Sequence, residues 1–532
     1  MSGNWGMAQG INNFKQFFAP KEASVWASAY LNKNVTSSNI LYLINYGKVA
    51  NYATNSKENL ISKDELKAYY DTLYTQESHS HPLAFANYKE VETTKHIHRL
   101  HPYKGKFIPQ LVEYFLDSHT DTLKTESCFQ KGDIVLDIFA GSGTTLCVAS
   151  ELGMHSIGID ISCFNTMLVN AKLGRYDSNL LESECYRLIQ VLESFYENSN
   201  IKAFEETLTQ HLNAFNAEFF PKEFKRKVVL KEIDEKVYGE IKEREFLSIY
   251  DKLVKQFNID LNVKNNGSFL DFWYIESIKK ELILLKNEII KAPKDLQNIL
   301  SIILSRTARS CRATTHADLT TLKEPMLKSY YCKKHGRICK PLFSSLKWFK
   351  SYAKDTLKRI KEFETLRSDC FSLCLNADSC NVDIINEVKK QNPTFANLLH
   401  SQKIAGIFSS PPYVGLIDYH EQHAYSYELF NLERKDALEI GAKLKGQSKN
   451  AKENYAKAIA MALNNAKNFL KQDYNVFLVA NDKFNLYPSI AQMAGMQIVK
   501  RYDRPVLNRS EKDTNAYSES IFHLKDKNET SH

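Results

Sequence analysis

The segment from Ile134 to Asp160 constrains the fold of this chain more than any other stretch. It starts with the apolar run Ile134-Val-Leu-Asp-Ile-Phe139, breaks at the turn Ala140-Gly-Ser-Gly143, and continues with apolar residues at helical spacing. A second apolar run, Ser156-Ile-Gly-Ile159, ends in Asp160. A strand, a tight loop, a helix and a second strand in this order are typical of a parallel sheet covered by helices. The sequence therefore predicts a doubly wound α/β core.

The turn in this segment also predicts a ligand. Gly141 and Gly143 let the backbone bend sharply and bring N–H groups close to a bound molecule, and the start of the next helix favours electronegative groups. Asp160 follows the loop by about twenty residues, where an acid can accept both hydroxyls of a ribose. Leu146 stands where a dinucleotide fingerprint has its third glycine, which disfavours an oxidoreductase. An ordinary glycine turn is the alternative.

The residues Asp137 to Thr145 resemble the cofactor motif of DNA amino-methyltransferases, which usually reads D-P-F-x-G-S-G-T-T. Ile138 stands where the family usually has proline. The resemblance implies S-adenosylmethionine as the cofactor and a Rossmann-like sheet around it. It assigns cofactor binding to Asp137, Phe139, Ala140, Gly141, Ser142, Gly143, Thr144, Asp160 and Ile161.

Two further stretches lie where this family has cofactor contacts. Lys104-Gly-Lys-Phe-Ile-Pro-Gln-Leu111 resembles the family's flanking motif, which implies that Phe107 and Pro109 wall the methionine end of the cofactor. Pro109 also suits the first turn of a helix. Phe371-Ser-Leu-Cys-Leu-Asn-Ala-Asp378 predicts a third strand, and the resemblance places Asp378 near the adenine ring of the cofactor.

Ser410-Pro-Pro-Tyr413 follows the apolar run Ile404 to Phe408 and resembles the family motif [D/N/S]-P-P-[Y/F/W] at the end of the fourth strand. Pro411 and Pro412 have no N–H and fix φ at about −65°, so the chain leaves the sheet with its carbonyls free to accept. Ser410 and the Pro411 carbonyl are expected to accept the protons of an exocyclic amine that attacks a methyl group. Tyr413 is expected to stack on the flipped base. A rigid surface turn is the alternative.

The motif residues also predict which base is methylated. Methylation at carbon 5 of cytosine needs a cysteine nucleophile, conventionally after proline, and no cysteine of this sequence follows a proline. Serine at position 410 resembles the enzymes that methylate cytosine N4, so the sequence predicts a sequence-specific cytosine-N4 DNA methyltransferase of a restriction-modification system. Adenine-N6 methylation, RNA or protein-amide methylation, and a non-catalytic DNA-binding regulator with this fold stay open as alternatives.

The order of the motifs resembles the alpha arrangement of the family, which places the target-recognition region between strands two and three. About 190 surplus residues lie in that interval, where a parallel crossover needs only a few dozen. We therefore expect residues 1–80 to form a DNA-binding module, 81–170 and 366–532 the two parts of the methyltransferase domain, and 171–365 the recognition insert. Strand five is expected at Asn475–Ala480, and a closing hairpin at Arg504–Arg509 with Glu519–Leu524.

Positive charge concentrates in residues 301–361, which carry fifteen Lys or Arg against three acids. The window has a net charge of +12, and the rest of the chain sums to −4. A polyanion partner favours such a segment because each neutralised phosphate releases a counterion. Arg306, Arg309 and Arg312 recur every three residues and are expected to contact phosphates or guanine edges. A solvated helix face is the alternative.

The same window contains a candidate zinc set, Cys311, Cys332, His335 and Cys339. Reduced thiols in a basic loop are the alternative. His96, His98 and His101 form another cluster, without an acid at ligand spacing, and are interpreted as surface or cofactor-wall residues rather than metal ligands.

The first 80 residues resemble the winged helix-turn-helix of excisionases. Glu22–Leu31 predicts a helix, Thr36–Gly47 a capped second helix, and a short hairpin and a helix at Lys63–Asp71 follow. In that family the second helix enters the major groove. The resemblance therefore implies DNA contacts by Ser37, Ser38, Asn39 and Tyr42. A helical hairpin packed on the catalytic domain is the alternative.

Length and composition fit these expectations. A chain of 532 residues predicts two or three domains, and 43% hydrophobic with 25% charged residues is typical of a globular protein. No apolar stretch reaches the roughly eighteen residues of a membrane span, and ten scattered cysteines favour the reducing cytoplasm. The predicted fold class is thus α/β, a methyltransferase sheet with a largely helical insert and a small N-terminal helical or winged module. Double-stranded DNA and a cognate restriction endonuclease are the expected partners.

Overall fold

The computed structural model describes residues 16–31, 35–45, 49–53, 58–73, 81–316, 323–506 and 518–527. They fall into two compact units, one of Met1–Ala84 with Phe220–Glu240 and one of Phe85–Phe219 with Ile241–His532. None of the helices in the described ranges is both long and apolar enough to cross a lipid bilayer.

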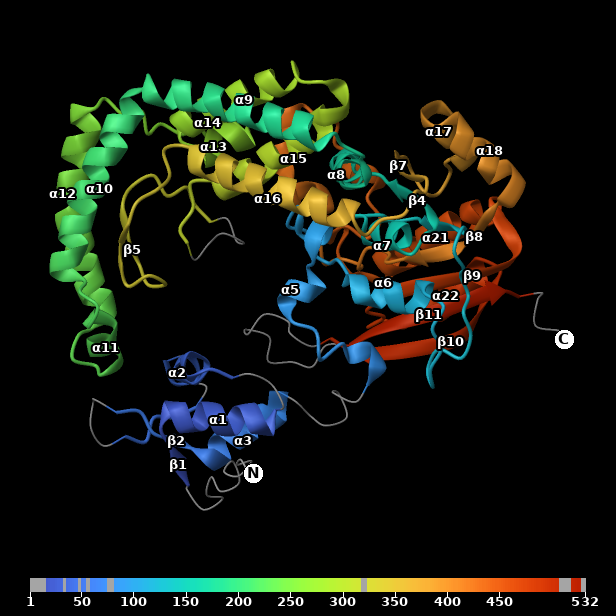
Figure 1. Ribbon diagram of the computed structural model, residues 1–532, viewed down its shortest axis with the longest axis horizontal. Coiled ribbons are helices and arrows are strands. Elements are labelled where there is room, and N and C mark those ends of the chain that lie inside the picture. The colour runs from blue at the N-terminus through green and yellow to red at the C-terminus, as the bar shows by residue number, and fades with distance from the viewer. Residues whose placement is uncertain are drawn as a thin grey trace, which may run out of the picture. The chain divides into compact units, whose positions relative to one another are not determined.

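The larger unit is built on a seven-stranded sheet in the order β10-β11-β9-β8-β3-β4-β7 (Figure 1). The strands are β3 Ile134–Asp137, β4 His155–Asp160, β7 Ser372–Asn376, β8 Ile404–Ser409, β9 Leu470–Ala480, β10 Met496–Pro505 and β11 Ser518–Asp526. β7, β4, β3, β8 and β9 run parallel, whereas β11 is antiparallel to both β9 and β10. The strand order reverses beside β3, and such a reversal leaves a crevice at the carboxyl ends of the strands.

The expected strands are present, with differences at two places. The fifth strand begins at Leu470 rather than Asn475. The closing hairpin was misplaced, because its first strand is Met496–Pro505 and pairs with β11 from Met496 opposite Asp526 to Pro505 opposite Ser518. Residues 507–509 lie outside the described part of the chain. β10 is an edge strand with several half-buried or exposed residues, so its sequence lacks the continuous apolar run of a central strand.

Helices cover both faces of the sheet, as the doubly wound prediction requires. One face packs on α17 Ile384–Gln391, α18 Pro393–Gln402, α21 Lys449–Lys467 and α22 Tyr487–Met493. On the other side lie α6 Pro109–Leu116, α7 Thr144–Glu151 and α8 Cys163–Leu173. Every residue of β3 is buried, as expected for a central parallel strand. Short helices complete the larger unit: α5 Glu90–Thr93, η2 His96–Arg99, α19 Tyr419–Gln422, α20 Ala424–Phe430, η3 Asp436–Leu438 and η4 Lys443–Lys445. The short helix η1 Pro82–Ala84 belongs to the smaller unit.

The long segment between β4 and β7 is largely helical. Its helices are α9 Ser178–Glu197, α10 Asn200–Phe219, α11 Phe224–Val229, α12 Glu235–Gln256, α13 Phe269–Trp273, α14 Glu276–Ile289, α15 Lys294–Ser310 and α16 Leu346–Glu364. α9, α14, α15 and α16 pack against one another (Figure 1). A two-stranded hairpin, β5 Tyr330–Cys332 and β6 Arg337–Cys339, lies between α15 and α16 in the chain.

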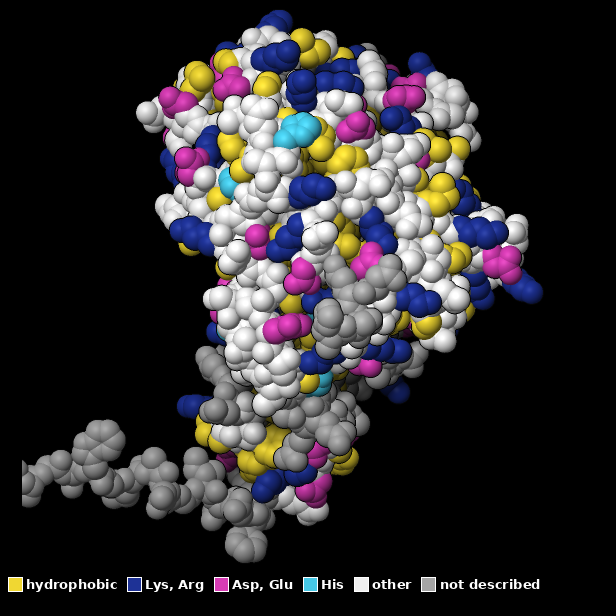
Figure 2. All heavy atoms as spheres, turned by 90° about the vertical axis from the view of Figure 1, so that its right-hand side faces the viewer, with side chains coloured by type: hydrophobic (Ala, Val, Ile, Leu, Met, Phe, Trp, Pro, Cys, Tyr) yellow, Lys and Arg dark blue, Asp and Glu magenta, His cyan; other side chains and the backbone are white. Residues whose placement is uncertain are grey.

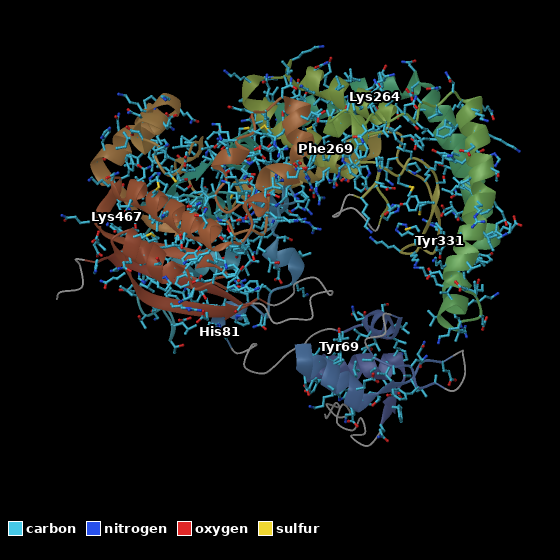
Figure 3. All side chains as sticks on the ribbon, turned by 180° about the vertical axis from the view of Figure 1, so that it is seen from behind. Tyr69, His81, Lys264, Phe269, Tyr331 and Lys467 are labelled. Atoms are coloured by element: carbon cyan, nitrogen blue, oxygen red, sulfur yellow. The ribbon has the colours of Figure 1, made fainter. Side chains whose placement is uncertain are left out.

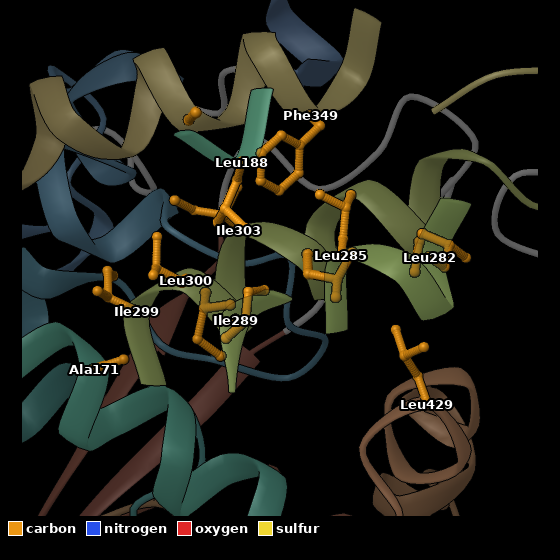
Figure 4. Packing of buried hydrophobic residues seen from close by; sticks show 14 of the residues in the cluster. Ala171, Leu188, Leu282, Leu285, Ile289, Ile299, Leu300, Ile303, Phe349 and Leu429 are labelled. Atoms are coloured by element: carbon orange, nitrogen blue, oxygen red, sulfur yellow. The ribbon is translucent and has the colours of Figure 1, made fainter. Parts of the chain in front are cut away.

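The hydrophobic core of these helices is continuous with that of the sheet's own helices (Figure 4). Leu285 of α14, Ile303 of α15 and Phe349 of α16 join Ala171 of α8 and Leu429 of α20 in one buried cluster. Burial of this shared apolar area stabilises the insert by packing it on the catalytic framework. The helices α14, α15 and α16 therefore share a hydrophobic core with the sheet's own helices and do not form a core of their own.

The N-terminal residues of the smaller unit form β1 Phe17–Phe18, α1 Pro20–Tyr30, α2 Ser37–Asn45, β2 Ile61–Ser62 and α3 Lys63–Leu73. Ile40, Leu43, Ile61 and Leu66 are buried among other residues of this module. The hairpin expected before α3 differs from the structure, since the described two-stranded ladder pairs β2 with β1 at the start of the module. Asn32–Asn34 and Tyr46–Lys48 lie outside the described residues.

Candidate active site

The loop between β3 and α7 is shaped by two glycines in the left-handed region. Gly141 has φ of +49° and Gly143, the residue before α7, has φ of +74°. A Cβ at Gly143 would lie 2.8 Å from Cγ1 of Val169, so neither the backbone angle nor the space admits a side chain. The loop therefore turns tightly and presents its backbone at the carboxyl edge of the sheet.

Asp160, the last residue of β4, is held against this loop. Its carboxylate accepts the N–H of Gly141 and the N–H of Ser162, both at 2.8 Å, and an amide N–H of Asn165 at 3.2 Å. Burial raises the pKa of Asp160 to about 6 because desolvation disfavours the charged form, although these donors oppose the shift.

Asp137, the last residue of β3, joins the loop to the Ser-Pro-Pro-Tyr segment. Its carboxylate accepts the Ser409 hydroxyl at 2.6 Å and the Phe139 N–H at 3.1 Å. The same Phe139 N–H lies 3.2 Å from the oxygen of Ser409. Asp137 is 1% exposed and burial raises its pKa to about 6. This carboxylate thus lies beneath the loop and fixes it relative to β8.

A cavity that is open to solvent lies at this edge of the sheet. The sequence-predicted residues that line it are Phe107, Phe139, Ala140, Gly141, Ser142, Thr144, Asp160, Ile161, Asp378, Ser410 and Pro412. Pro109, Asp137, Gly143, Pro411 and Tyr413 are not in the lining, although each lies within three residues of one that is. The predicted cofactor residues and the Ser-Pro-Pro-Tyr segment therefore meet at one cavity.

Hydrogen bonds fix the side chains of Ser410 and Tyr413 in the Ser-Pro-Pro-Tyr segment that follows β8. The Ser410 hydroxyl donates to the carbonyl of Val479 at 3.0 Å, which engages its proton and leaves oxygen lone pairs as acceptors. The Tyr413 hydroxyl donates to Glu519 of β11 at 2.9 Å. Arg504 of β10 lies 3.2 Å from the same carboxylate. The segment is therefore anchored to both β9 and the closing hairpin.

The cavity also contains residues that the sequence patterns did not single out. Tyr103 and Tyr419 stack with ring centroids 6.1 Å apart, and Asn165 donates to the Tyr103 hydroxyl at 3.3 Å. Outside the lining, Lys172 is buried on α8 and donates to the carbonyl of Ser142, which does line the cavity, at 2.6 Å; burial lowers the pKa of Lys172 to about 8. Tyr103 directly precedes the flanking motif, so extending that motif by one residue would have included it. Tyr419 lies in a connection that has no local signature.

The comparisons with known proteins decide the family. The type II methyltransferase M.MjaII of Methanocaldococcus jannaschii is 43% identical over 531 residues, which cover 97% of this chain and 98% of that relative. The chain belongs to the type II DNA methyltransferases. A family model described as DNA methylase matches residues 5–165, and the type II methyltransferase M.BsoBI of Geobacillus stearothermophilus is 35% identical over 106 residues, 20% of this chain and 18% of that relative. No solved structure matches the chain.

Type II DNA methyltransferases act in restriction-modification systems and take their methyl group from S-adenosylmethionine. The lining of the cavity suits this cofactor in its polar and aromatic groups. Asp160 and Asp378 offer carboxylate oxygens, and Phe107 and Phe139 offer rings. Asn165 is 2% exposed, and its amide oxygen has no hydrogen-bond partner among the described residues. An unmet acceptor in the lining is what a ligand with hydroxyl and amino groups would satisfy.

Of the three arginines assigned to DNA in this type II methyltransferase, Arg306 requires a correction. Arg306 is 7% exposed, pairs with Asp355 at 2.6 Å and lies 4.3 Å from the centre of the Tyr352 ring. It is a packed ion pair between α15 and α16, and cannot reach a phosphate. Arg309 and Arg312 are half-buried, and the Arg312 Nε–H donates to the carbonyl of Arg309 at 3.0 Å. These three residues therefore do not share one exposed face.

Acidic residues from other helices pair with several lysines of the basic segment 301–361. Acids of α9, α10 and α12 pair with its lysines: Glu193 with Lys350, Glu205 with Lys340, and Asp251 with Lys328. Figure 2 is seen from the side on which α17 and α18 lie in Figure 1, away from the β5–β6 hairpin, and there too basic and acidic side chains are interspersed. Lys333, Lys334 and Arg337, around the turn of the β5–β6 hairpin, are exposed.

The metal candidates also differ from the expected sets. Cys311 is buried in the helical core, whereas His316 lies with Cys332, His335 and Cys339. His96, His98 and His101 are buried and do not line the cavity, which corrects their interpretation as surface or cofactor-wall residues. His96 and His98 lie beside an acid from another helix, Glu151, which sequence spacing could not show. His101 instead contacts the Ser305 hydroxyl at 2.9 Å.

The N-terminal residues assigned to DNA lie at the start of α2. Ser38 and Asn39 are exposed, and Ser37 is half-buried with its hydroxyl 3.4 Å from that of Ser24. The Asn39 amide oxygen accepts the Thr36 N–H at 2.9 Å and so caps the helix. Tyr42 belongs to the same helix, but its side chain lies outside the described part of the structure.

Proposed function

We propose that this chain is a sequence-specific DNA methyltransferase that transfers a methyl group to the exocyclic N4 of cytosine. The observation that carries the proposal is that Asp160 and Ser410 line one cavity. Asp160 is an acid suited to a ribose, and Ser410 occupies the motif position that differs between cytosine and adenine enzymes. Both residues therefore face one cavity. Serine at position 410 resembles the cytosine-N4 enzymes rather than the adenine-N6 enzymes.

The proposed chemistry needs acceptors rather than a nucleophile from the protein. S-adenosylmethionine supplies a methyl group on a sulfonium, which an amine can attack directly. The Ser410 oxygen is proposed to accept one proton of the amine, and the bond from its own hydroxyl to the Val479 carbonyl supports this role because it leaves the oxygen lone pairs as acceptors. The Pro411 carbonyl accepts the other, because proline leaves no ladder partner for this turn. Two accepted protons orient the nitrogen lone pair and increase its electron density.

The cofactor is proposed to lie between the loop and the flanking motif. Asp160 accepts the ribose hydroxyls, Asp378 lies near the adenine, and Phe107 with Phe139 covers the apolar parts. The remaining predicted residues of the loop, Ala140, Gly141, Ser142, Thr144 and Ile161, line the site with them. Asp137, Gly143 and Pro109 act indirectly, since they fix the loop and the first turn of α6.

The base is proposed to enter beside Pro412, with Tyr413 stacking on it. Tyr413 is half-buried and its hydroxyl is tied to Glu519, so the ring is held in one orientation. A fixed ring offsets part of the few kcal/mol that unstacking a base costs. DNA contacts are proposed for Arg309, Arg312 and the start of α2, and a cognate restriction endonuclease is proposed as partner.

Nucleoside mass spectrometry of DNA from cells that express the protein tests this proposal. N4-methylcytosine is expected with the unaltered chain and is expected to be lost with Asp160→Asn. N6-methyladenine in its place would establish the adenine alternative. Unmodified DNA from cells that contain folded, cofactor-binding protein would contradict the enzymatic function and favour a regulator.

A further inference from the structure

The hairpin β5–β6 carries a compact set of metal-binding side chains outside the methyltransferase site. Single ligand atoms of His316, Cys332, His335 and Cys339 all lie within 4.8 Å of one another. Three of these residues belong to the hairpin, and His316 comes from the segment that follows α15. Figure 3 shows this hairpin at the labelled Tyr331. Two sulfurs and two imidazoles therefore converge from separate parts of the chain.

The hairpin backbone places these ligands on one side. Cys332 lies two residues after Tyr330, and Cys339 lies opposite Tyr330 in the ladder, so these side chains share a face. The turn is closed by the N–H groups of His335 and Gly336, which donate to the Cys332 carbonyl at 3.1 and 2.7 Å. Gly336 takes φ of +61°, which a turn this tight requires. Cys332 and His335 are thus the first and fourth residues of one tight turn.

The distances between donor atoms match those around a single tetrahedral ion. Nδ1 of His335 lies 3.4 Å from Sγ of Cys339, and Nδ1 of His316 lies 3.8 Å from Sγ of Cys332. Zinc bonds of about 2.3 Å to sulfur and about 2.0 Å to nitrogen place neighbouring ligand atoms about 3.6 Å apart at tetrahedral angles. These two pairs of ligand atoms are therefore already near the spacing that zinc would impose, and all four atoms lie within 4.8 Å of one another.

Neighbouring groups hold these ligands in position. The Tyr330 hydroxyl accepts the backbone N–H of His316 at 3.0 Å, which fixes the chain at this ligand. Its 2.8 Å contact with Nδ1 of His316 would be exchanged for the metal bond if that nitrogen binds the ion. Asn216 of α10 bonds both the N–H and the carbonyl of Ile338 at 3.0 Å. Glu243 of α12 accepts the N–H of Tyr331 at 2.7 Å. The ligand set is thus supported from two helices.

We propose that His316, Cys332, His335 and Cys339 bind one structural zinc ion. Two thiolates and two imidazoles favour zinc over magnesium or calcium, which prefer oxygen ligands. Strands of three residues are short for a stable hairpin. A metal that joins residue 316 to the hairpin closes this part of the chain and keeps Lys333 and Arg337 exposed at its turn.

Metal analysis of the untagged full-length protein tests the proposal. After expression with added zinc and dialysis against a weak chelator, about one zinc per chain is expected, falling to about a tenth or less with Cys332→Ser or Cys339→Ser. Cys311→Ala is the matched control, since that thiol belongs to the helical core, and His96→Ala with His98→Ala controls for the cluster beside Glu151. Both controls are expected to keep their zinc.

Cobalt substitution provides a second readout that does not depend on activity. The unaltered protein is expected to show the charge-transfer and d–d absorption of tetrahedral cobalt with thiolate ligands, weakened by His316→Ala. Three results would overturn the proposal: a folded protein with less than about 0.2 zinc per chain, zinc retained in both serine variants, or an intact mass about two daltons lower that shows a disulfide instead.

Discussion

At the scale of single residues, the Asp160 carboxyl makes cofactor binding sensitive to pH. Its pKa of about 6 exceeds the usual 3.8, so it gains a proton as the pH falls through 6 and can no longer accept with both oxygens. We expect the Kd for S-adenosylmethionine, measured by calorimetry, to rise about tenfold from pH 7 to pH 5.

The control for this profile is Asp160→Asn, which is expected to bind more weakly with a nearly flat dependence on pH over the same range. An unchanged Kd of the unaltered protein between pH 5 and 7 would contradict the assigned role. The raised pKa also has a consequence for stability. Between about pH 4 and 6 the folded state retains a proton that the unfolded chain has lost, so the contribution of Asp160 to stability falls as the pH rises.

Substitutions of the adjacent residues Ser409 and Ser410 are expected to affect cofactor binding and kcat differently. Ser409 donates to Asp137 beneath the loop, whereas Ser410 faces the cavity. We expect Ser409→Ala to weaken cofactor binding with a smaller change in kcat. Ser410→Ala is expected to lower kcat about 100-fold with the Kd for the cofactor unchanged, as for loss of one acceptor in a transition state. Single-turnover kinetics and calorimetry measure the two quantities, and equal effects of both variants on kcat would contradict the assignment.

At the scale of helices and strands, α15 and α16 are joined by a buried ion pair rather than prepared for DNA. Removing Arg306 leaves Asp355 partly buried beside the remaining Arg359. We expect Arg306→Met to lower the free energy of unfolding by about 2 to 4 kcal/mol. The dependence of DNA affinity on salt should stay unchanged. Chemical denaturation and fluorescence anisotropy measure both. Arg309→Met, at a proposed DNA contact, is the contrasting variant and should lower the salt slope, and a reduced slope with unchanged stability for Arg306→Met would restore the DNA role of Arg306.

The hairpin β5–β6 is expected to contact the phosphate backbone. Replacing Lys333 and Arg337 by alanine removes two exposed charges at its turn. The slope of log K against log salt should fall by about two, since each phosphate contact contributes about 0.9. Lys389→Ala with Lys390→Ala, exposed on α17, is the matched control and should leave the slope unchanged. Identical slopes for the hairpin variant and the unaltered protein would exclude this contact.

Elements that depend on neighbouring residues could be predicted from the sequence, and contacts between distant residues could not. The strands of the sheet and both motifs could be located because each is local: an apolar run, a glycine turn or a pair of prolines. The role of Arg306 could not, because its partner Asp355 lies 49 residues away and pairs only once two helices pack. Sequence spacing does not indicate His316 for the same reason, because it meets the hairpin only in the folded chain. Spacing favours Cys311 as a ligand, although packing buries Cys311 in the helical core.

At the scale of the whole molecule, the N-terminal module is expected to add DNA affinity. Ser38→Glu places a negative charge at the exposed start of α2, where phosphate would approach. We expect DNA affinity to fall about tenfold, with the Kd for S-adenosylmethionine unchanged. Ser401→Glu, exposed on α18, is the matched control.

A shortened chain that starts near residue 85 gives an independent measurement. The compact unit also contains Phe220–Glu240, so the truncation removes only part of it and the point variant is the more selective change. Full DNA affinity in the shortened chain, with recognition of the same sequence, would contradict a DNA-reading role for residues 1–84.

The shared core of α8, α14, α15, α16 and α20 limits how a new specificity could be acquired. If the insert carries target recognition, as the sequence predicts, transplanting it whole from a relative would separate it from framework residues such as Ala171 and Leu429, against which it packs. Exchange between enzymes is therefore more practicable farther out, at the β5–β6 hairpin, which Asn216 of α10 holds through two hydrogen bonds to Ile338. Evolution of new targets in this lineage is expected to proceed there by point changes rather than by swapping the whole insert.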